Sequence, residues 1–306
     1  MHISVIIVSY NTKTLLKQCI DSIIAQTHDI SYEIIVSDNG STDGSIEMLT
    51  QYTFPVRVIE NNRNIGFGAA NNRALDIAQG AYILYLNSDT ILLNNALKIF
   101  YDYWQTAPNV QCIGALGTNL LDTNGNITHS YGRFPTMLQE LNIRAHAVYG
   151  TYKLQLLAWL FRKKAIACVR DIPKEKYIGP VDFITGANIF IKNTPAARFD
   201  ERYFMYCEDV DLAYQLYKQG LQCIVIDEPQ IIHLEGQSSG HTKTNEIDKY
   251  GTFSSIQNAI SKIIFFKKNN ESAILIICLK LLTSLLWCHP RLFAKTKKYL
   301  KQLWTI

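Results

Sequence analysis

The residues with the clearest chemical potential are Asn87, Ser88 and Asp89, which end the apolar run YILYLNSDT at residues 82–90. The run is typical of a buried strand, and the polar side chains come at its end. In parallel α/β sheets, ligands bind just beyond the carboxyl ends of the strands, so a carboxylate there is well placed to hold a metal ion or a substrate. Asn, Ser and Asp are also ordinary turn residues, and a simple turn is the alternative interpretation.

Two earlier strands end in a similar way. Asp38 follows the apolar run of YEIIVSDNGSTDG, and Asn64 and Gly66 lie in the loop NNRNIGFG after a predicted strand at 56–60. Glycine in such a loop lets the backbone approach a ligand closely, although a tight loop that needs a positive φ angle would favour it equally. Neither loop has the spacing of a dinucleotide-binding GxGxxG motif or of a P-loop. The recurrence at three strand ends favours a shared binding edge over three independent turns.

The second half of the chain carries a different set of chemical groups. Glu208, Asp209 and Asp211 lie where the segment EDVDLAYQLYKQG begins a predicted helix that Gly220 ends. The exposed amides and the dipole of a helix N-terminus favour carboxylates there, which would explain the cluster without any catalysis. His233 follows another apolar run, and a lone histidine is more often structural than a ligand.

Strands and helices alternate along the chain that must position these residues. The β-branched run ISVIIVSYN is typical of a strand covered on both faces, and apolar residues at helical spacing follow it. The alternation implies right-handed crossovers and a mostly parallel sheet flanked by helices, so we predict an α/β fold whose loops gather at one edge. Further along the chain we predict helix 45–52, strand 56–60, helix 94–106, strand 111–117, a hairpin at 120–128 with a type I′ turn at Asn124 and Gly125, strand 181–192 interrupted at Gly186, and strand 222–226.

The composition of the 306-residue chain limits the class of protein. With 48% hydrophobic residues the chain can bury a full core, and its net charge of +4 is too small to indicate a nucleic-acid partner. Its seven cysteines have neither CxxC pairs nor zinc-like spacing, which favours reduced thiols in the cytoplasm. No signal-peptide pattern precedes the first strand, so we predict that the protein is not exported.

The chain after Gln257 combines basic residues with an apolar run. It contains nine Lys and Arg residues and a single acidic residue, Glu271. The run AILIICLKLLTSLLW is shorter than the about 20 apolar residues that span a bilayer, and Lys280 breaks it. With Trp287 and Trp304 it indicates a helix at the cytoplasmic surface of a membrane, and the alternative is a terminal helix pair packed on the domain. A second basic amphipathic stretch, at 154–170, is interpreted as core packing, with membrane contact or acceptor guidance as the alternative.

Taken together, the motifs SVIIVSYN, VSDNGSTDG, NNRNIGFGAANN and YLNSDT resemble the nucleotide-binding half of inverting family 2 glycosyltransferases with the GT-A fold. The most similar subgroup is that of the bacterial rhamnosyltransferase-like enzymes of surface polysaccharide synthesis. The stretch FMYCEDVDL resembles the family motif FxxxEDxDL, and HLEGQS, with His233, Gly236 and Ser238, resembles its HxxGxS pattern. The resemblance covers roughly residues 1–125 and 180–240.

The resemblance implies roles for individual residues. Asp38 would contact the nucleobase or ribose of a nucleotide sugar. Because Asn87 replaces the first carboxylate of the family's DxD-type motif, Asp89 would be the only acidic metal ligand of its loop, and His233 would complete the protein ligands of Mn²⁺ or Mg²⁺. Asp209 would be the catalytic base. The remaining donor-side residues would be Tyr10, Asn64, Gly66 and Ser88, and the acceptor-side or supporting residues would be Gly186, Glu208 and Asp211.

The reaction that the resemblance implies is the transfer of a sugar, from TDP-rhamnose or a UDP-hexose, to a hydroxyl of a glycan acceptor on a polyprenyl lipid, at the inner face of the cell membrane. Residues 1–125 would bind the nucleotide sugar, 126–256 would form the acceptor and catalytic half of the same domain, and 257–306 would form a helical membrane-associating tail.

Two other classes of protein remain as alternatives. A sugar-phosphate nucleotidyltransferase would have a Gly-rich basic loop after the first strand, where this chain has SYNTKTLL. A non-catalytic, membrane-associated binder of nucleotide sugars would not need Asp89, Asp209 and His233 together. The sequence leaves the oligomeric state open.

Overall fold

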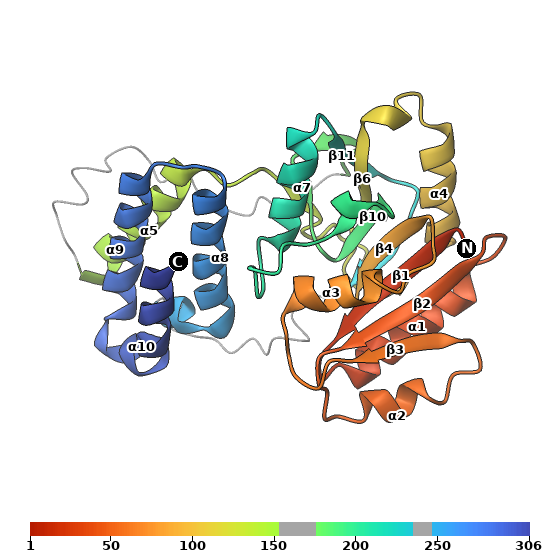
Figure 1. Cartoon of the computed structure of the whole chain (residues 1–306), viewed down its shortest axis with the longest axis horizontal. Helices are drawn as coiled ribbons and strands as arrows, with labels where there is room; N and C mark the ends of the chain where they lie inside the picture. The colour runs from red at the N-terminus through yellow and green to blue at the C-terminus, as the bar shows by residue number, and fades with distance from the viewer. Residues whose placement is uncertain (153–175, 235–246) are drawn as a thin grey trace. The chain divides into compact units, whose positions relative to one another are not determined.

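The computed structural model describes residues 1–152, 176–234 and 247–306, and the chain divides into two compact units (Figure 1). Among the described residues, the first unit contains 1–134, 176–204 and 208–234, and the second contains 135–152, 205–207 and 247–306. The functional division into residues 1–125, 126–256 and 257–306 that the sequence analysis predicted stays a prediction.

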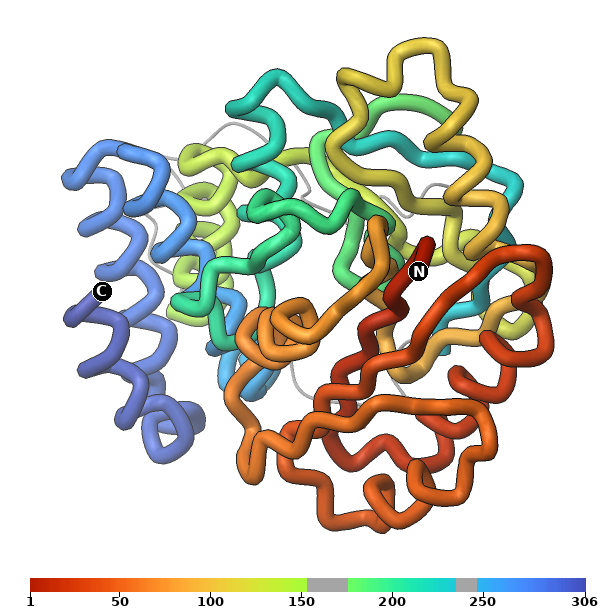
Figure 2. Tube along the Cα trace, turned by 45° about the vertical axis from the view of Figure 1, so that its right-hand side comes forward, coloured from red at the N-terminus to blue at the C-terminus, as the bar shows by residue number. Residues whose placement is uncertain are grey.

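An eight-stranded sheet forms the centre of the first unit, in the order β3-β2-β1-β4-β10-β6-β11-β8. The strands β3, β2, β1 and β4 are parallel, as are β6 and β11, whereas β10 runs antiparallel between β4 and β6, and β8 runs antiparallel beside β11. Figure 2 shows the N-terminal strand, β1, in the interior of this sheet, where β2 and β4 lie on its two sides. The mostly parallel α/β sheet predicted from the sequence is confirmed. The bounds are β1 Ile3–Ser9, β2 Tyr32–Asp38, β3 Val56–Glu60, β4 Tyr82–Asn87, β6 Ile113–Thr118, β8 Gly179–Val181, β10 Asn188–Lys192 and β11 Gln222–Ile226.

Helices cover both faces of the sheet because side chains alternate along each strand. In β1, Ile3, Val5 and Ile7 pack in one core with α1, α2 and α4, and Ile6 packs in the opposite core with α3 and α7. Both β1 faces are therefore buried, which explains its continuous apolar sequence. The bounds are α1 Lys13–Gln26, α2 Ser45–Leu49, α3 Phe67–Leu75, α4 Ala96–Thr106 and α7 Glu208–Lys218.

Two small antiparallel sheets complete the first unit. They pair β5 (Thr90–Leu92) with β12 (Ile231–His233), and β7 (Tyr131–Gly132) with β9 (Phe183–Ile184). The first pairing brings two segments distant in the sequence together directly after β4.

The predicted hairpin at 120–128 forms, but its predicted type I′ turn is wrong. Gly125 has a φ angle of +79°, whereas Asn124 is not in the positive-φ region that a type I′ turn requires of both central residues. The Asp122 carboxylate accepts hydrogen bonds from the backbone N–H groups of Asn124 and Asn126, each at 2.8 Å. These bonds favour a turn that begins at Asp122.

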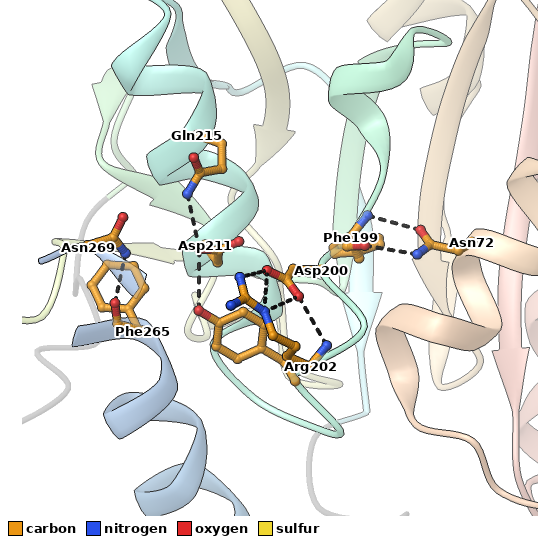
Figure 3. Close-up of polar contacts among 9 residues, drawn as sticks. Asn72, Phe199, Asp200, Arg202, Asp211, Gln215, Phe265 and Asn269 are labelled. Carbon is orange, nitrogen blue, oxygen red and sulfur yellow. Dashed lines mark hydrogen bonds and ion pairs between the residues drawn. The ribbon is translucent and has the colours of Figure 1, made fainter. Parts of the chain in front are cut away.

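The second unit is helical, and α9 packs against α5, α8 and α10. The Thr252 hydroxyl accepts a hydrogen bond from the Ser255 N–H at 3.2 Å and so caps α8. After the last residue of α8, the Asn269 amide donates to the Phe265 carbonyl at 2.8 Å (Figure 3). Pro290 begins α10, where its missing N–H costs nothing. The bounds are α5 Met137–Tyr152, α8 Phe253–Lys268, α9 Ala273–Trp287 and α10 Pro290–Thr305.

The apolar C-terminal run forms α9, as predicted. Among the described residues, no helix combines the length and the apolar character needed to cross a membrane. The amphipathic stretch at 154–170, together with Gly236 and Ser238 of the HxxGxS pattern, lies outside the described residues.

Candidate active site

The polar strand ends meet at one edge of the sheet. In the parallel ladders, Ser9 of β1 pairs with Asp38 of β2, and Asn87 of β4 pairs with Val8, one position earlier in β1. Asp38 also pairs with Glu60, the last residue of β3. The shared edge predicted from the sequence is thus present.

Asp38 shapes the loop that follows it. The residue is only 1% exposed, and its Oδ1 accepts hydrogen bonds from the N–H groups of Gly40 and Ser41 at 3.0 and 2.8 Å. Its Oδ2 accepts from the Ser41 hydroxyl at 2.5 Å. The Asn11 carboxamide oxygen, in turn, accepts from the Thr42 N–H at 2.8 Å and ties this loop to the end of β1. The exposed Tyr10 lies in the same β1 loop.

A second network joins the loops after β2 and β3. The Asn39 amide donates to Asn64 Oδ1 at 3.3 Å and to the Gly66 carbonyl at 3.2 Å, and Asn64 Oδ1 also accepts from the Gly66 N–H at 3.0 Å. We did not predict Asn39, although it stands next to Asp38 in the oxygen-rich loop. Gly66 needs its small size, because its φ angle is +95° and a Cβ there would lie 2.5 Å from the Phe204 carbonyl oxygen.

Asp89 and His233, which we call the ligand pair, lie together just beyond β4. Asp89 Oδ1 is 3.2 Å from His233 Nε2, and the two side chains are 8% and 11% exposed. Asn87 Nδ2 lies 3.4 Å from the same nitrogen. Pairing of β5 with β12 positions the imidazole, and the Leu234 N–H donates to the Asp89 carbonyl at 2.9 Å. Ser88 is held separately by a hydrogen bond from the Thr12 hydroxyl at 3.1 Å.

The ligand pair fits a divalent cation. Two adjacent ligands of an octahedral ion, each about 2.1 Å from it, lie about 3 Å apart. The carboxylate oxygen suits both Mg²⁺ and Mn²⁺, whereas the imidazole nitrogen favours a transition-metal ion such as Mn²⁺. In the part of the chain that the structure describes, no group of three His, Cys, Asp or Glu side chains could hold a metal ion. Among the described residues, an ion held by this pair would thus have Asp89 and His233 as its only His, Cys, Asp or Glu ligands.

Asp209 is hydrogen-bonded to the short segment that connects β9 to β10. Its Oδ2 accepts a hydrogen bond from the Gly186 N–H at 3.0 Å, and its Oδ1 accepts from the Val210 N–H at 2.8 Å. The Ala187 carbonyl accepts from the Asn87 N–H at 3.2 Å. The adjacent residues Gly186 and Ala187 thus connect the carboxylate of the predicted base to the strand end that leads to Asp89.

A protein-family model described as glycosyl transferase family 2 matches residues 4–162, about half of the chain. The chain belongs to this family. This glycosyltransferase is also 26% identical over 257 residues to an N-acetylglucosaminyl-diphospho-decaprenol L-rhamnosyltransferase of Mycobacterium tuberculosis, and the match covers 79% of each chain.

Two solved structures confirm the GT-A fold of the glycosyltransferase. The mannosyltransferase PcManGT from Pyrobaculum calidifontis, in complex with GDP-Man and Mn²⁺, has a TM-score of 0.54 and 16% identity, over 97% of this chain and 74% of that chain. S. aureus TarS 1-349 in complex with UDP-GlcNAc has a TM-score of 0.51 and 16% identity, over 95% of this chain and 74% of that chain. At these identities the similarity shows the fold alone.

The acidic start of α7 in the glycosyltransferase divides its carboxylates between different environments. Asp211 is buried, and its Oδ1 accepts hydrogen bonds from the Tyr203 hydroxyl at 3.3 Å and from the Gln215 amide at 3.2 Å (Figure 3). The Gln215 amide is a neutral hydrogen-bond donor to this carboxylate. Asp211 therefore holds the preceding loop against α7.

The same loop is hydrogen-bonded to α3 of the glycosyltransferase. The Asn72 amide of α3 donates to the Phe199 carbonyl at 2.8 Å, and the Phe199 N–H donates to Asn72 Oδ1 at 2.9 Å (Figure 3). The Phe67 N–H donates to the Phe204 carbonyl at 3.0 Å. These contacts connect the loop at Gly66 to the residues just before α7, and no sequence pattern predicted them.

Glu208 differs from its neighbours because it is buried without compensation. Glu208 is 7% exposed, and among the described residues its Oε2 has no hydrogen-bond partner. Burial, followed by the negative charge of Asp209, raises the pKa of the Glu208 carboxyl well above its usual range. The raised pKa favours a protonated, neutral Glu208 next to Asp209.

Glu208→Gln is expected to stabilise the protein against heat at neutral pH. The folded state keeps a proton on Glu208 that the unfolded state releases above the ordinary pKa of 4.5. Wild-type stability is therefore complete below that value and falls as the pH rises toward the folded-state pKa. Gln has no proton to lose, so the difference in Tm between variant and wild type should grow from near zero at about pH 4.

Differential scanning calorimetry between about pH 4 and pH 8 measures this difference. Glu47→Gln, the same change at an exposed position of α2, is the control and should show no such growth. A Tm difference for Glu208→Gln that stays constant over the pH range would contradict a neutral Glu208.

Proposed function

We propose that this glycosyltransferase is a metal-dependent inverting enzyme of bacterial surface polysaccharide synthesis. The proposal rests on two kinds of group that lie near the end of β4. The ligand pair follows this strand, and Asp209 accepts a hydrogen bond from Gly186, whose neighbour Ala187 is bonded to Asn87 at the strand end. A nucleotide-sugar transferase needs both kinds, one for the departing diphosphate and one for the attacking hydroxyl.

Asp89 and His233 would hold Mg²⁺ or Mn²⁺, with donor phosphate oxygens and water as the other ligands. The ion, when bound, neutralises the charge that develops on the leaving diphosphate. Asp209 accepts the proton of the acceptor hydroxyl as that oxygen attacks the anomeric carbon. The hydrogen bonds from Gly186 and Val210 hold the carboxylate in place for this step. A single displacement with one base inverts the anomeric centre, by the logic of inverting glycosidases.

The donor in this proposal is TDP-rhamnose, with UDP-hexoses as second candidates. The name of the M. tuberculosis relative supports L-rhamnose as the sugar and a polyprenyl-diphosphate glycan as the acceptor. Nucleotide sugars in the two structural neighbours support a nucleotide-sugar donor in general. Asp38, Tyr10, Asn64, Gly66 and Ser88 would line the donor side. A lipid-linked acceptor further suggests that the helical C-terminal unit works at the cytoplasmic membrane surface.

The test is nucleotide release by the purified protein with Mn²⁺ and a panel of nucleotide sugars. We expect release of TDP from TDP-rhamnose at a rate that exceeds the release from UDP-hexoses and that falls to background with EDTA. Equal background release from every donor, despite saturable donor binding, would instead indicate a non-catalytic binder of nucleotide sugars. Release that EDTA leaves unchanged would contradict the metal-dependent mechanism.

A further inference from the structure

The turn that leads into α7 contains two residues with an unfavourable backbone conformation. Tyr206 and Cys207 have φ angles of 69° and 63°, in the left-handed region. Every other described non-glycine residue with a positive φ angle is Asn or Asp, whose short polar side chains tolerate this region. Tyr and Cys gain no such help. Residues 205–207, which we call the left-handed turn, are therefore strained directly before Glu208 and the proposed base Asp209.

Hydrogen bonds hold the chain on both sides of the left-handed turn. Before it, the Phe204 carbonyl accepts from the Phe67 N–H at 3.0 Å. After it, Asp209 Oδ2 accepts from the Gly186 N–H at 3.0 Å. A strained backbone persists only where the surrounding structure fixes it, and such strain is found mainly at functional sites. These two bonds fix the ends of the turn.

The left-handed turn itself is held by α8. Residues 205–207 belong to the second, helical unit, and within that unit Ser261 Oγ donates a hydrogen bond to the Met205 carbonyl at 2.9 Å. Ser261 is only 1% exposed. A serine inside a helix often bonds the carbonyl one turn earlier in its own helix, whereas this hydroxyl reaches a residue 56 positions away in the sequence. Removing the hydroxyl would remove one of the constraints on the strained turn.

We propose that Ser261 is a positioning residue for the base: its hydrogen bond to Met205 holds the left-handed turn, and the turn sets where α7 begins. The inference deepens, and rests on, the proposed role of Asp209. Only Glu208 separates the turn from Asp209 in the chain, so a turn that relaxed to negative φ angles would displace the carboxylate. A displacement of about 1 Å can slow a reaction about 10²-fold.

The first experiment compares kcat and the KM of TDP-rhamnose in the wild type and in Ser261→Ala. We expect kcat to fall about 10–10²-fold while the KM stays near its wild-type value, because the donor-side residues do not belong to the turn. Thr296→Val is the matched control. It removes a buried hydroxyl that donates to the Trp287 carbonyl at 2.7 Å in the same unit, so it should lower the Tm as Ser261→Ala does but leave kcat unchanged. Unchanged kcat in Ser261→Ala, or equal falls in both variants, would overturn the proposal.

A second change in the turn tests whether strain is the cause. Glycine adopts a positive φ angle without a steric cost, so Cys207→Gly removes strain that Ser261 otherwise has to oppose. Cys207→Ala removes the same thiol and keeps the strain. We expect Ser261→Ala combined with Cys207→Gly to recover most of the lost kcat, and Ser261→Ala combined with Cys207→Ala to recover none. Two equally slow double variants would show that Ser261 does not act by opposing this strain.

Two further measurements do not depend on activity. In the otherwise wild-type protein, Cys207→Gly should have a higher Tm than Cys207→Ala, the reverse of the usual order at a negative φ angle. This comparison holds even if Ser261→Ala does not fold, and the usual order would overturn the proposal. Hydrogen exchange of the amides at 205–209, followed by mass spectrometry, should be faster in Ser261→Ala than in the wild type and in Thr296→Val. Equal exchange in the three proteins would also overturn it.

The positioning role and the proposed activity can fail separately in these tests. Wild-type turnover together with an unchanged kcat in Ser261→Ala would overturn only the positioning role. Faster exchange at 205–209 in Ser261→Ala, in a protein that releases nucleotide from no donor, would overturn the transferase activity and leave Ser261 as the residue that holds the left-handed turn.

Discussion

Asp209→Asn is expected to lower the rate of sugar transfer about 10²–10⁴-fold while donor binding stays intact, because a positioned general base contributes an effect of that size. Asn keeps the shape of the side chain and one oxygen that can accept from the Gly186 N–H, which is now 3.0 Å from Asp209 Oδ2. What it loses is the ability to take the proton of the acceptor hydroxyl. The connection at Gly186 and the donor side should therefore remain in place.

The measurement separates kcat from the Kd of the nucleotide, for instance by steady-state kinetics with calorimetric titration of TDP and UDP. Asp102→Asn makes the same chemical change at an exposed ion pair of α4 and should leave both quantities near their wild-type values. Near-normal turnover in Asp209→Asn would eliminate Asp209 as the base. Loss of nucleotide binding together with turnover would instead indicate a structural role.

The sheet edge could be predicted from the sequence because its causes are local. Continuous apolar runs marked β1, β2 and β4, and the parallel order of these strands necessarily brings Asp38 and Asn87 to one edge. The start of α7 was equally visible from its acidic first turn and from Gly220 after its end. Each of these features depends on a few neighbouring residues and on general rules of α/β folds.

The link between the two halves of the site could not be predicted in this way. It depends on β10, which inserts antiparallel between β4 and β6 and brings Ala187 to Asn87, 100 residues away in the sequence. No local pattern encodes such a pairing. The environment of Glu208 was also missed, since a carboxylate in a first helical turn is normally exposed, whereas tertiary packing buries this one.

The surroundings of Gln215 and Asn87 show why a residue type alone is a weak guide. Gln215 carries no charge, yet its amide donates a hydrogen bond to Asp211 Oδ1 at 3.2 Å. A neutral donor is sufficient there because the Tyr203 hydroxyl shares the same carboxylate oxygen. In the proposed mechanism, the neutral Asn87 leaves Asp89 as the only carboxylate of its loop that would hold the ion.

Asp89→Asn is accordingly expected to reduce metal-dependent nucleotide release about 10²–10³-fold, the range found when one group that stabilises developing charge is removed. The variant keeps a side-chain oxygen at the same place, 3.2 Å from His233 Nε2 in the wild type, but loses the negative charge that attracts the ion. Release should therefore need a much higher Mn²⁺ concentration. Electron paramagnetic resonance of free Mn²⁺ in the presence of nucleotide measures the loss of binding without reference to activity.

Asn87→Asp provides the opposite change in the same loop and makes the prediction specific. It adds a second carboxylate beside His233 Nε2, which Asn87 Nδ2 approaches to 3.4 Å, so the Mn²⁺ concentration for half-maximal release should fall. A general disturbance of the loop would weaken the metal response in both variants, whereas a charge effect moves them in opposite directions. If Asp89→Asn responded to Mn²⁺ as the wild type does, the ligand pair would have to be assigned a structural role, because neither Asn87 nor Ser88 could replace the missing charge.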